Sequence, residues 1–271
     1  ATIVNGILTP RPRPFAQFGE VEYRDDLGKS RYNALETTLD KRFSDGYTIR
    51  AVYTLSNSKD NTGEHLTNNG SSSSLPNSRD ASLWYGNSDF DVKHRFVING
   101  ILELPFGSGK RFLTEGIGAA IFGGWDLAAS FNHRTGRPFT VTQGGNPLRV
   151  GTFQPALPNL VGNPRIENPT IDRWFDRAAF QPLTPGVSTF GDQRRNVLRG
   201  PKFASLDFAV HRRFGLWNED TNLEFRWEVF NALNRANFAL PNRSIDSASV
   251  GTITALQGDP RVMQFAVRFN F

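Results

Sequence analysis

Three short segments of this sequence carry residue types that could perform chemistry. Asp89, Asp91 and His94 combine carboxylates with an imidazole, a set that could bind a metal ion or transfer a proton. In a strand, however, Asp91 and His94 would lie on opposite faces, which favours a polar junction between a loop and a strand. The serines at 71–74 lack the Gly-x-Ser-x-Gly context of a nucleophile and indicate a flexible loop. Residues 107–110 (GSGK) lack the first glycine and the following helix of a phosphate-binding loop, and we expect a turn there.

The amino-acid composition excludes several further kinds of functional site. The chain of 271 residues has 4 His and no Cys, so it offers no disulfide, thiolate ligand or thiol nucleophile. No nucleophile has a base nearby in the sequence, and we expect no enzymatic activity, no metal and no cofactor. The net charge of +5 arises from 31 Lys and Arg distributed among 26 Asp and Glu. Because no basic block is present, nucleic acid is not expected as a partner.

Alternation of apolar and polar residues is the dominant pattern, and it predicts an all-β protein. In one segment, Leu206, Phe208 and Val210 alternate with Asp207 and His211. Each alternating segment has roughly the 9–11 residues that a tilted membrane strand requires. Helical signals are scarce, and the clearest is a short turn-like segment at 168–175 with a possible cap at Asn168 or Thr170. The predicted strands, about seven, cover residues 34–43, 47–56, 95–106, 125–134, 205–214, 223–233 and 262–271.

The same alternation fits a soluble sandwich or a transmembrane β-barrel. Mean hydropathy is low, at -0.42, yet the chain contains 23 Phe, 5 Trp and 5 Tyr. No apolar run reaches the roughly 18–20 residues of a membrane helix. The strands of a barrel alternate apolar and polar residues, so a low mean hydropathy does not exclude them. Three features favour the membrane barrel: a strongly charged polar face, polar exceptions on the apolar face that fall near strand ends, and aromatic residues at one set of strand ends. Examples of the exceptions are Lys41, His94, His133, Arg212 and Arg261, and the aromatic pairs are Phe43 with Tyr47, Phe106 with Trp125, Phe214 with Trp217, and Phe269 with Phe271.

Connection lengths predict the orientation of the strands. Asp45-Gly46 is a tight hairpin signal and residues 215–222 form a short polar link. The other connections, at 57–91, 139–200 and 236–259, are long and rich in Ser, Asn, Gly and Pro. Short turns of outer-membrane barrels are periplasmic and long loops are extracellular. The link at 105–124 is long for a periplasmic turn and does not fit this scheme. Residues 1–5 carry no export signal, so we expect one upstream.

Two sets of residues are candidates for function. The first is a polar lattice that we expect to face the lumen of the barrel, with most of its charges mutually paired: Arg50, Arg95, Glu224, Arg226, Glu228 and Arg268. The second lies in the last ten residues, which alternate and end on an aromatic residue, as outer-membrane barrels do. There we predict an assembly signal that the barrel assembly machinery reads: Phe265, Val267, Phe269 and Phe271.

An ordered series of short motifs extends over nearly the whole chain. The motifs are SRYNAL (30–35), KRF (41–43), AVYTLS (51–56), SDFDVKHR (88–95), ELPFG (103–107), GGW (123–125), TGRPF (135–139), PNLVG (158–162), WF (174–175), NVLRGP (196–201), EVFNALN (228–234) and DPR (259–261). In their shared order they resemble the carboxy-terminal barrel of Oar-like TonB-dependent receptors, whose amino-terminal part often carries a carboxypeptidase-regulatory-like domain. The long link at 105–124 also occurs in that family.

The resemblance implies a barrel of roughly 22 antiparallel strands, filled by an amino-terminal plug and opened by TonB. Residues 1–271 would be the carboxy-terminal part of this barrel, without the plug, in the cell outer membrane. The implied function is TonB-driven uptake of a substrate. The implied partners are outer-membrane lipid, the remaining strands and plug, TonB through the missing amino-terminal part, and the barrel assembly machinery.

Two alternatives use the same strands. A small self-contained outer-membrane barrel with an adhesive or structural role would need an eighth strand, for which residues 15–23 are the candidate. A soluble β-protein would need a second layer that covers the apolar faces of the strands.

Overall fold

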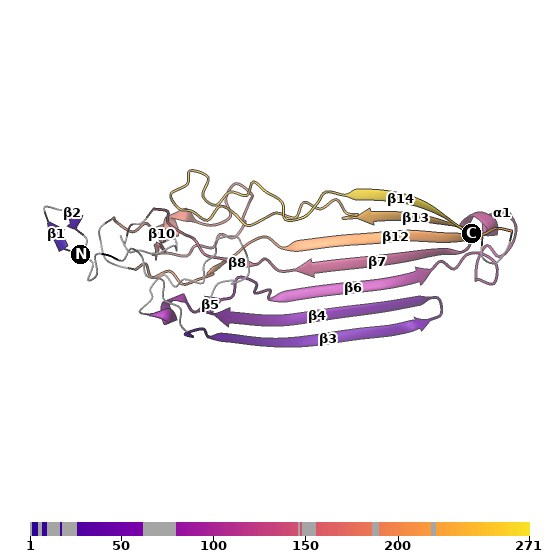
Figure 1. The fold of residues 1–271 in the computed structure, drawn as a ribbon, viewed down its shortest axis with the longest axis horizontal. Coiled ribbons are helices and arrows are strands. Elements are labelled where there is room, and N and C mark those ends of the chain that lie inside the picture. Colours follow the sequence, from indigo (N-terminus) through magenta and orange to yellow (C-terminus); the bar gives the residue numbers. More distant parts are fainter. Residues whose placement is uncertain are drawn as a thin grey trace.

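The computed structural model describes residues 2–4, 7–9, 17, 26–61, 80–145, 147, 156–185, 190–217 and 221–271. Long strands lie side by side in one sheet, with long connections at one end and short turns and a helix at the other (Figure 1). We call these the loop end and the turn end. The candidate eighth strand at 15–23 and the serines at 71–74 lie outside the described residues, except for Gln17.

All seven predicted strands are present, and every neighbouring pair is antiparallel. The order across the sheet is β14-β13-β12-β7-β6-β4-β3, and the short strand β5 (Gly86–Asn87) pairs with β4 outside this order. Within the described residues β3 and β14 are the two edges, so the sheet is not closed. The long strands are β3 (Ser30–Ser44), β4 (Tyr47–Asp60), β6 (His94–Glu103), β7 (Trp125–Arg134), β12 (Phe203–Gly215), β13 (Asn222–Phe230) and β14 (Val262–Asn270).

The register of the strands gathers the predicted apolar residues on one face. Ala51 is the cross-strand partner of both Leu39 and Ile98. Further along the sheet, Val229 is the partner of both Phe208 and Met263. Directly opposed residues share a face, and the face changes with each step along a strand. One face of the sheet is therefore predominantly apolar, and the other carries the predicted polar residues.

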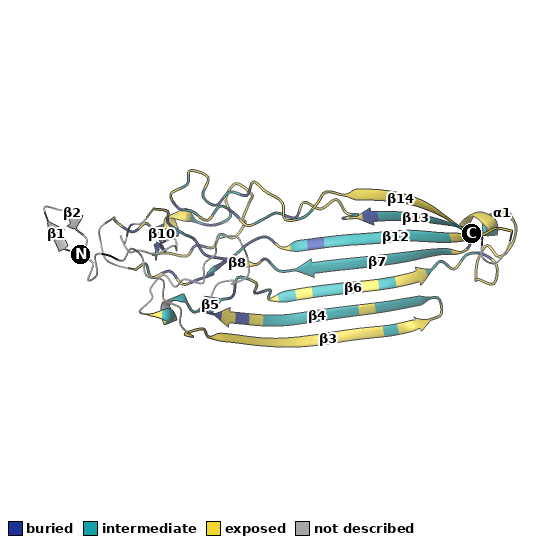
Figure 2. Ribbon diagram, viewed as in Figure 1, coloured by how far each residue is buried: buried dark blue, intermediate teal, exposed yellow. Residues whose placement is uncertain are grey.

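This sheet is a single layer. Among the described hydrophobic residues that are buried, all but Ala204 and Val229 lie outside the seven long strands. The edge strands are exposed and the interior strands half-buried (Figure 2). Leu39 is 67% exposed and Phe265 is 65% exposed. An apolar face of this extent must be covered by another apolar phase.

The turn end contains one tight hairpin and two longer links. Asp45 and Gly46 have φ values of 56° and 80°, which is the type I′ turn that the sequence predicted. In the link between β6 and β7, the N–H of Lys110 donates to the carbonyl of Gly107 at 3.1 Å and closes the predicted turn. The same link forms the helix α1 (Gly116–Phe122), which the sequence did not predict. Among the described residues no helix is both long and apolar enough to cross a membrane.

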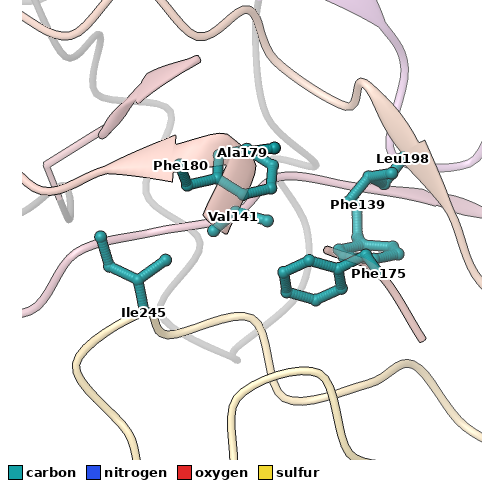
Figure 3. Packing of buried hydrophobic residues seen from close by; sticks show 7 residues of the cluster. All are labelled: Phe139, Val141, Phe175, Ala179, Phe180, Leu198 and Ile245. Carbon is teal, nitrogen blue, oxygen red and sulfur yellow. The ribbon is translucent and has the colours of Figure 1, made fainter. Parts of the chain in front are cut away.

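The described parts of the three long connections, 61–93, 135–202 and 231–261, form a packed loop layer. Its hydrophobic core contains Phe139, Phe175, Phe180 and Ile245 (Figure 3). The rings of Phe175 and Phe180 meet edge to face with centroids 5.7 Å apart, a favourable aromatic geometry. Short pieces of regular structure tie the layer together: β8 (Pro138–Phe139) with β11 (Leu198–Arg199), β9 (Asn159–Leu160) with β10 (Phe180–Gln181), and the 3-10 helices η1 (Ala81–Trp84) and η2 (Arg177–Ala179). A separate hairpin joins β1 (Thr2–Val4) and β2 (Ile7–Thr9).

The segment at 168–175 forms bends and a turn, with no helix. Thr170 is the capping residue of this turn, because its hydroxyl accepts a hydrogen bond from the N–H of Arg173 at 3.2 Å. The helical turn begins later, at η2, where the side chain of Asp176 accepts from the N–H of Ala178. The turn-like character and the cap at Thr170 were therefore predicted correctly, whereas the following 3-10 helix with its cap at Asp176 was not predicted.

Candidate functional site

Charged residues of the polar face form a row across β7, β12 and β13. Glu224 accepts a hydrogen bond from Nη2 of Arg226 at 3.0 Å and lies 3.2 Å from Nε2 of His211. Nη1 of Arg226 is 3.7 Å from Oε1 of Glu228, and Nδ1 of His211 is 3.7 Å from Oδ2 of Asp126. Acidic and basic groups thus alternate along the row. The predicted mutual pairing of Glu224, Arg226 and Glu228 is present.

The remaining residues of the predicted lattice lie on the same face. The cross-strand partner of Arg50 is Asn99, that of Arg95 on the β7 side is Arg134, and that of Arg268 is Glu224. Each of these partners is polar, so each residue of the predicted lattice lies beside another polar residue. His211 and Asp126 were placed on this face by their parity, but no sequence pattern indicated that they extend the ion-paired row.

The polar face is hollowed near its centre. A hollow of about 410 Å³ is lined by residues of β4, β6, β7, β12 and β13. Small side chains such as Ala128, Ser130 and Ala209 make up part of its lining. Arg50 on β4 lines the hollow towards the β3 edge of the sheet, and Glu228 on β13 lines it towards the β14 edge. The lining of the hollow is thus mostly apolar, with charged residues on both sides of it.

The segment that contains Asp89, Asp91 and His94 joins the sheet to the loop layer. Asp89 accepts hydrogen bonds from Nη2 of Arg195 at 2.6 Å and from Nδ2 of Asn196 at 2.8 Å. Asp91 is fully buried and pairs with Arg199, while its other oxygen accepts from the N–H of Ser58 at 2.6 Å. His94 instead hydrogen-bonds the hydroxyl of Tyr53 at 2.8 Å. These contacts agree with the predicted polar junction between loop and strand.

Arg195 is the centre of this junction. Its side chain is 1% exposed and also pairs with Asp60 at the end of β4, which is 6% exposed. The ring of Trp84 lies 5.5 Å from the guanidinium carbon. Sequence reasoning missed this cluster. The signal for this cluster in the sequence was the motif at 196–201, which contains both Asn196 and Arg199.

The residues of the predicted assembly signal line the free edge of the sheet. Phe265 and Val267 on β14 are each 65% exposed, and Phe269 is 47% exposed. Phe265 stacks on Trp227 of β13 with centroids 5.8 Å apart, and Phe269 stacks on Phe271 at the same distance. Phe271 follows β14 and is 95% exposed. These apolar side chains form one row on the apolar face and are free to contact lipid or another protein.

Aromatic residues are concentrated at the turn end of the apolar face, as the sequence predicted. Trp125 meets Phe225 edge to face at 5.7 Å, and Trp217 lies 6.3 Å from Phe269. Nζ of Lys41 lies 4.1 Å from the ring centroid of Tyr47. Rings with nearby cationic groups are typical of the boundary between lipid tails and headgroups.

An antiparallel single-layer sheet with one apolar face, one ion-paired polar face and an aromatic end belongs to the class of transmembrane β-barrel walls. The comparison with known families agrees with this class. The family model described as outer membrane beta barrel domain matches residues 5–264. The chain belongs to this family and is an outer-membrane protein. Searches among curated proteins and among solved structures found no match.

Proposed function

We propose that the chain is the carboxy-terminal part of the barrel of a TonB-dependent receptor and forms one wall of a substrate path across the outer membrane. The observation that carries this proposal is the polar face with its central hollow, opposite a predominantly apolar face. A wall with one wet side and one lipid side suits a barrel that encloses a polar interior. The order of the sequence motifs supports the narrower assignment to the receptor family.

The two ends of the sheet have different roles in this proposal. The loop layer is the extracellular surface that meets the substrate first, and its hydrophobic core keeps that surface in a defined shape. The hollow between Arg50 and Glu228 packs against the plug of the full-length receptor. The turn end faces the periplasm, where TonB engages the amino-terminal part.

The test uses calorimetry to measure binding of the purified periplasmic domain of TonB to the full-length receptor in detergent. We expect a complex of one TonB domain per receptor. Residues 1–271 alone are the control and should not bind, because the TonB contact belongs to the amino-terminal part. A full-length protein that binds no TonB under these conditions would exclude the proposed transport mechanism.

A small self-contained barrel is the second candidate, and the seven described strands do not close it by themselves. β3 and β14 both run from the loop end to the turn end, so they cannot close the sheet as an antiparallel pair without an eighth strand (Figure 1). Residues 1–271 refolded in detergent should then give no compact species on unheated gels. A compact, heat-modifiable species would favour the small barrel.

The exposed row of β14 supports a contact with the barrel assembly machinery. Phe271→Asp places a charge in this row and should reduce the fraction of full-length receptor inserted in the outer membrane. Fractionation of cells separates inserted from periplasmic material. The matched control is Asn270→Asp, at the half-buried neighbour, which should insert normally. Equal insertion of both variants would remove this role.

A further inference from the structure

The helix α1 exposes a strongly apolar surface. Residues 112–124 contain one ionisable residue, Glu115, and the helix buries none of its own side chains. Ile117 is 79% exposed, and Ile121, one turn later, is 53% exposed. Leu113 and Phe122 add 48% and 54% exposed side chains to the same region. Side chains four residues apart lie on one side of a helix, so Ile117 and Ile121 form an apolar stripe, and Leu113 precedes the helix.

Two side chains attach the end of α1 to the apolar face of the sheet. Arg212 donates to the carbonyls of Ala120 and Ile121, at 2.6 Å in each case. Trp125 donates from Nε1 to the carbonyl of Ile121 at 2.9 Å. Arg212 and Trp125 are cross-strand partners, and Arg212 also opposes Phe225 on the apolar face. Because both donors belong to that face, α1 is held on the lipid side of the strand ends.

The attachment explains why an arginine interrupts the apolar face. A free guanidinium among lipid tails is unfavourable. Here its charge meets the carbonyl end of a helix, where the helix dipole is negative. The guanidinium carbon also lies 4.1 Å from the ring centroid of Phe214 and 5.6 Å from that of Trp125. Arg212 is therefore paired within the protein while its apolar neighbours face outwards.

The backbone at the base of the helix is closely packed. A Cβ added to Gly107 or to Gly123 would come within 2.7 Å of the Cα of the other glycine. Only glycine at both positions allows this approach, and Gly107 also has a φ of +106°, which favours glycine. The two ends of the link are thus fixed to each other, and α1 has a defined place against the sheet.

We infer that α1 is an interfacial anchor, whose apolar stripe is embedded in the phospholipid leaflet at the turn end of the barrel. The lipid surface is favoured as the occupant because α1 continues the lipid-facing apolar face through Arg212 and Trp125. A basic residue is also placed for phospholipid headgroups: Arg111 precedes the helix and lies 5.2 Å from the ring of Phe112, whereas Lys110 is paired with Glu103. This inference needs an outer-membrane barrel but does not depend on TonB.

The test measures the depth of spin labels in the full-length protein, without other cysteines, in vesicles of phosphatidylethanolamine and phosphatidylglycerol. Labels at Ile117→Cys and Ile121→Cys should lie about 5–10 Å below the lipid phosphates, with high oxygen and low nickel-chelate accessibility. Ser108→Cys, an exposed position in the same link, is the matched control and should be accessible to the chelate. Equal chelate accessibility at 117 and 108 would overturn the anchor. Protection of 117 from both oxygen and chelate would instead indicate a protein partner and would overturn it as well.

A second variant tests whether the hydrogen bonds of Arg212 hold α1 in place. Arg212→Leu suits the apolar face, so the barrel should still fold and show the same heat-modifiable band. Without the two hydrogen bonds from Arg212, the label at 117 should become more mobile and shift towards the aqueous phase. An unchanged depth and mobility at 117 in this variant would overturn the role of Arg212 in placing the helix.

Discussion

Leu39 and Thr38 are neighbours on β3 that face different surroundings. Leu39 lies on the apolar face beside Ala51, and Thr38 lies on the polar face beside Val52. Leu39→Arg should lower the free energy of unfolding by roughly 2–4 kcal/mol if the position is near the bilayer midplane. Thr38→Arg should cost much less, because the polar interior accepts the charge. Denaturant unfolding of the full-length protein in lipid measures both.

Equal costs at 38 and 39 would mean that the two faces are assigned wrongly. The choice of Leu39 is important for this comparison. Val229 is also on the apolar face but is only 2% exposed, so a charge there would report burial within the protein instead of contact with lipid.

The packing of the loop layer can be tested at Gly136 by the addition of a single atom, the Cβ of alanine. A Cβ at this position would overlap the carbonyl oxygen of Gly200. Gly136→Ala must therefore displace backbone, and we expect it to destabilise the layer by about 1–3 kcal/mol, as overpacking does. Limited proteolysis should then cut the loop layer faster. Gly215→Ala, with no atom near the added Cβ and no positive φ, is the control and should leave the cleavage rate unchanged.

The sequence was sufficient to assign residues to faces, because side chains in a strand alternate with a strict period of two. It was not sufficient to find partners across strands. The contact of His211 with Glu224 depends on the offset between β12 and β13, which no local pattern encodes. Arg212 was recognised as an exception near a strand end, whereas its helix partner could not be inferred.

At the scale of elements, Arg195 is one of the side chains that join the loop layer to the sheet. Arg195→Ala would leave the carboxylates of Asp60 and Asp89 without this partner in a largely buried site, which costs about 3–5 kcal/mol for a buried pair. We expect faster hydrogen exchange of residues 80–93 and 190–202, with the strands unaffected. Arg194→Ala removes an exposed neighbour of the same type and should leave exchange unchanged. Equal exchange in the two variants would show that the junction is held elsewhere.

Elements differed in how well the sequence predicted them. The seven strands and the Asp45-Gly46 turn follow from local alternation and turn chemistry, and all were found. The loop layer was missed because its core joins residues from distant positions, such as Phe139, Phe175 and Ile245, within segments that have no period. The helix α1 was missed because its stripe is short and lies in a glycine-rich link. Its position depends on Arg212, far along the chain.

At the scale of the whole molecule, the apolar face has no covering layer within the described residues. Residues 1–271 should therefore aggregate in detergent-free buffer and disperse in detergent, because exposed apolar surface of this extent drives association. Analytical ultracentrifugation in the two buffers measures this. A monodisperse, detergent-free monomer with a cooperative thermal transition would contradict the lipid-facing assignment.

The directions of the edge strands also constrain how the barrel closes. β3 and β14 run the same way, so an all-antiparallel wall needs an odd number of further strands between them, which makes the total even, as in bacterial single-chain barrels. A disulfide requires Cα atoms roughly 4.4–6.8 Å apart, which only adjacent strands provide. In the full-length protein, Val267→Cys paired with cysteines scanned along β3 should therefore form no disulfide. The cross-strand pair Trp227→Cys with Phe265→Cys is the positive control and should form one on mild oxidation. A disulfide between β3 and β14 would show that these two strands are adjacent and parallel. The seven strands would then close into a barrel without further strands.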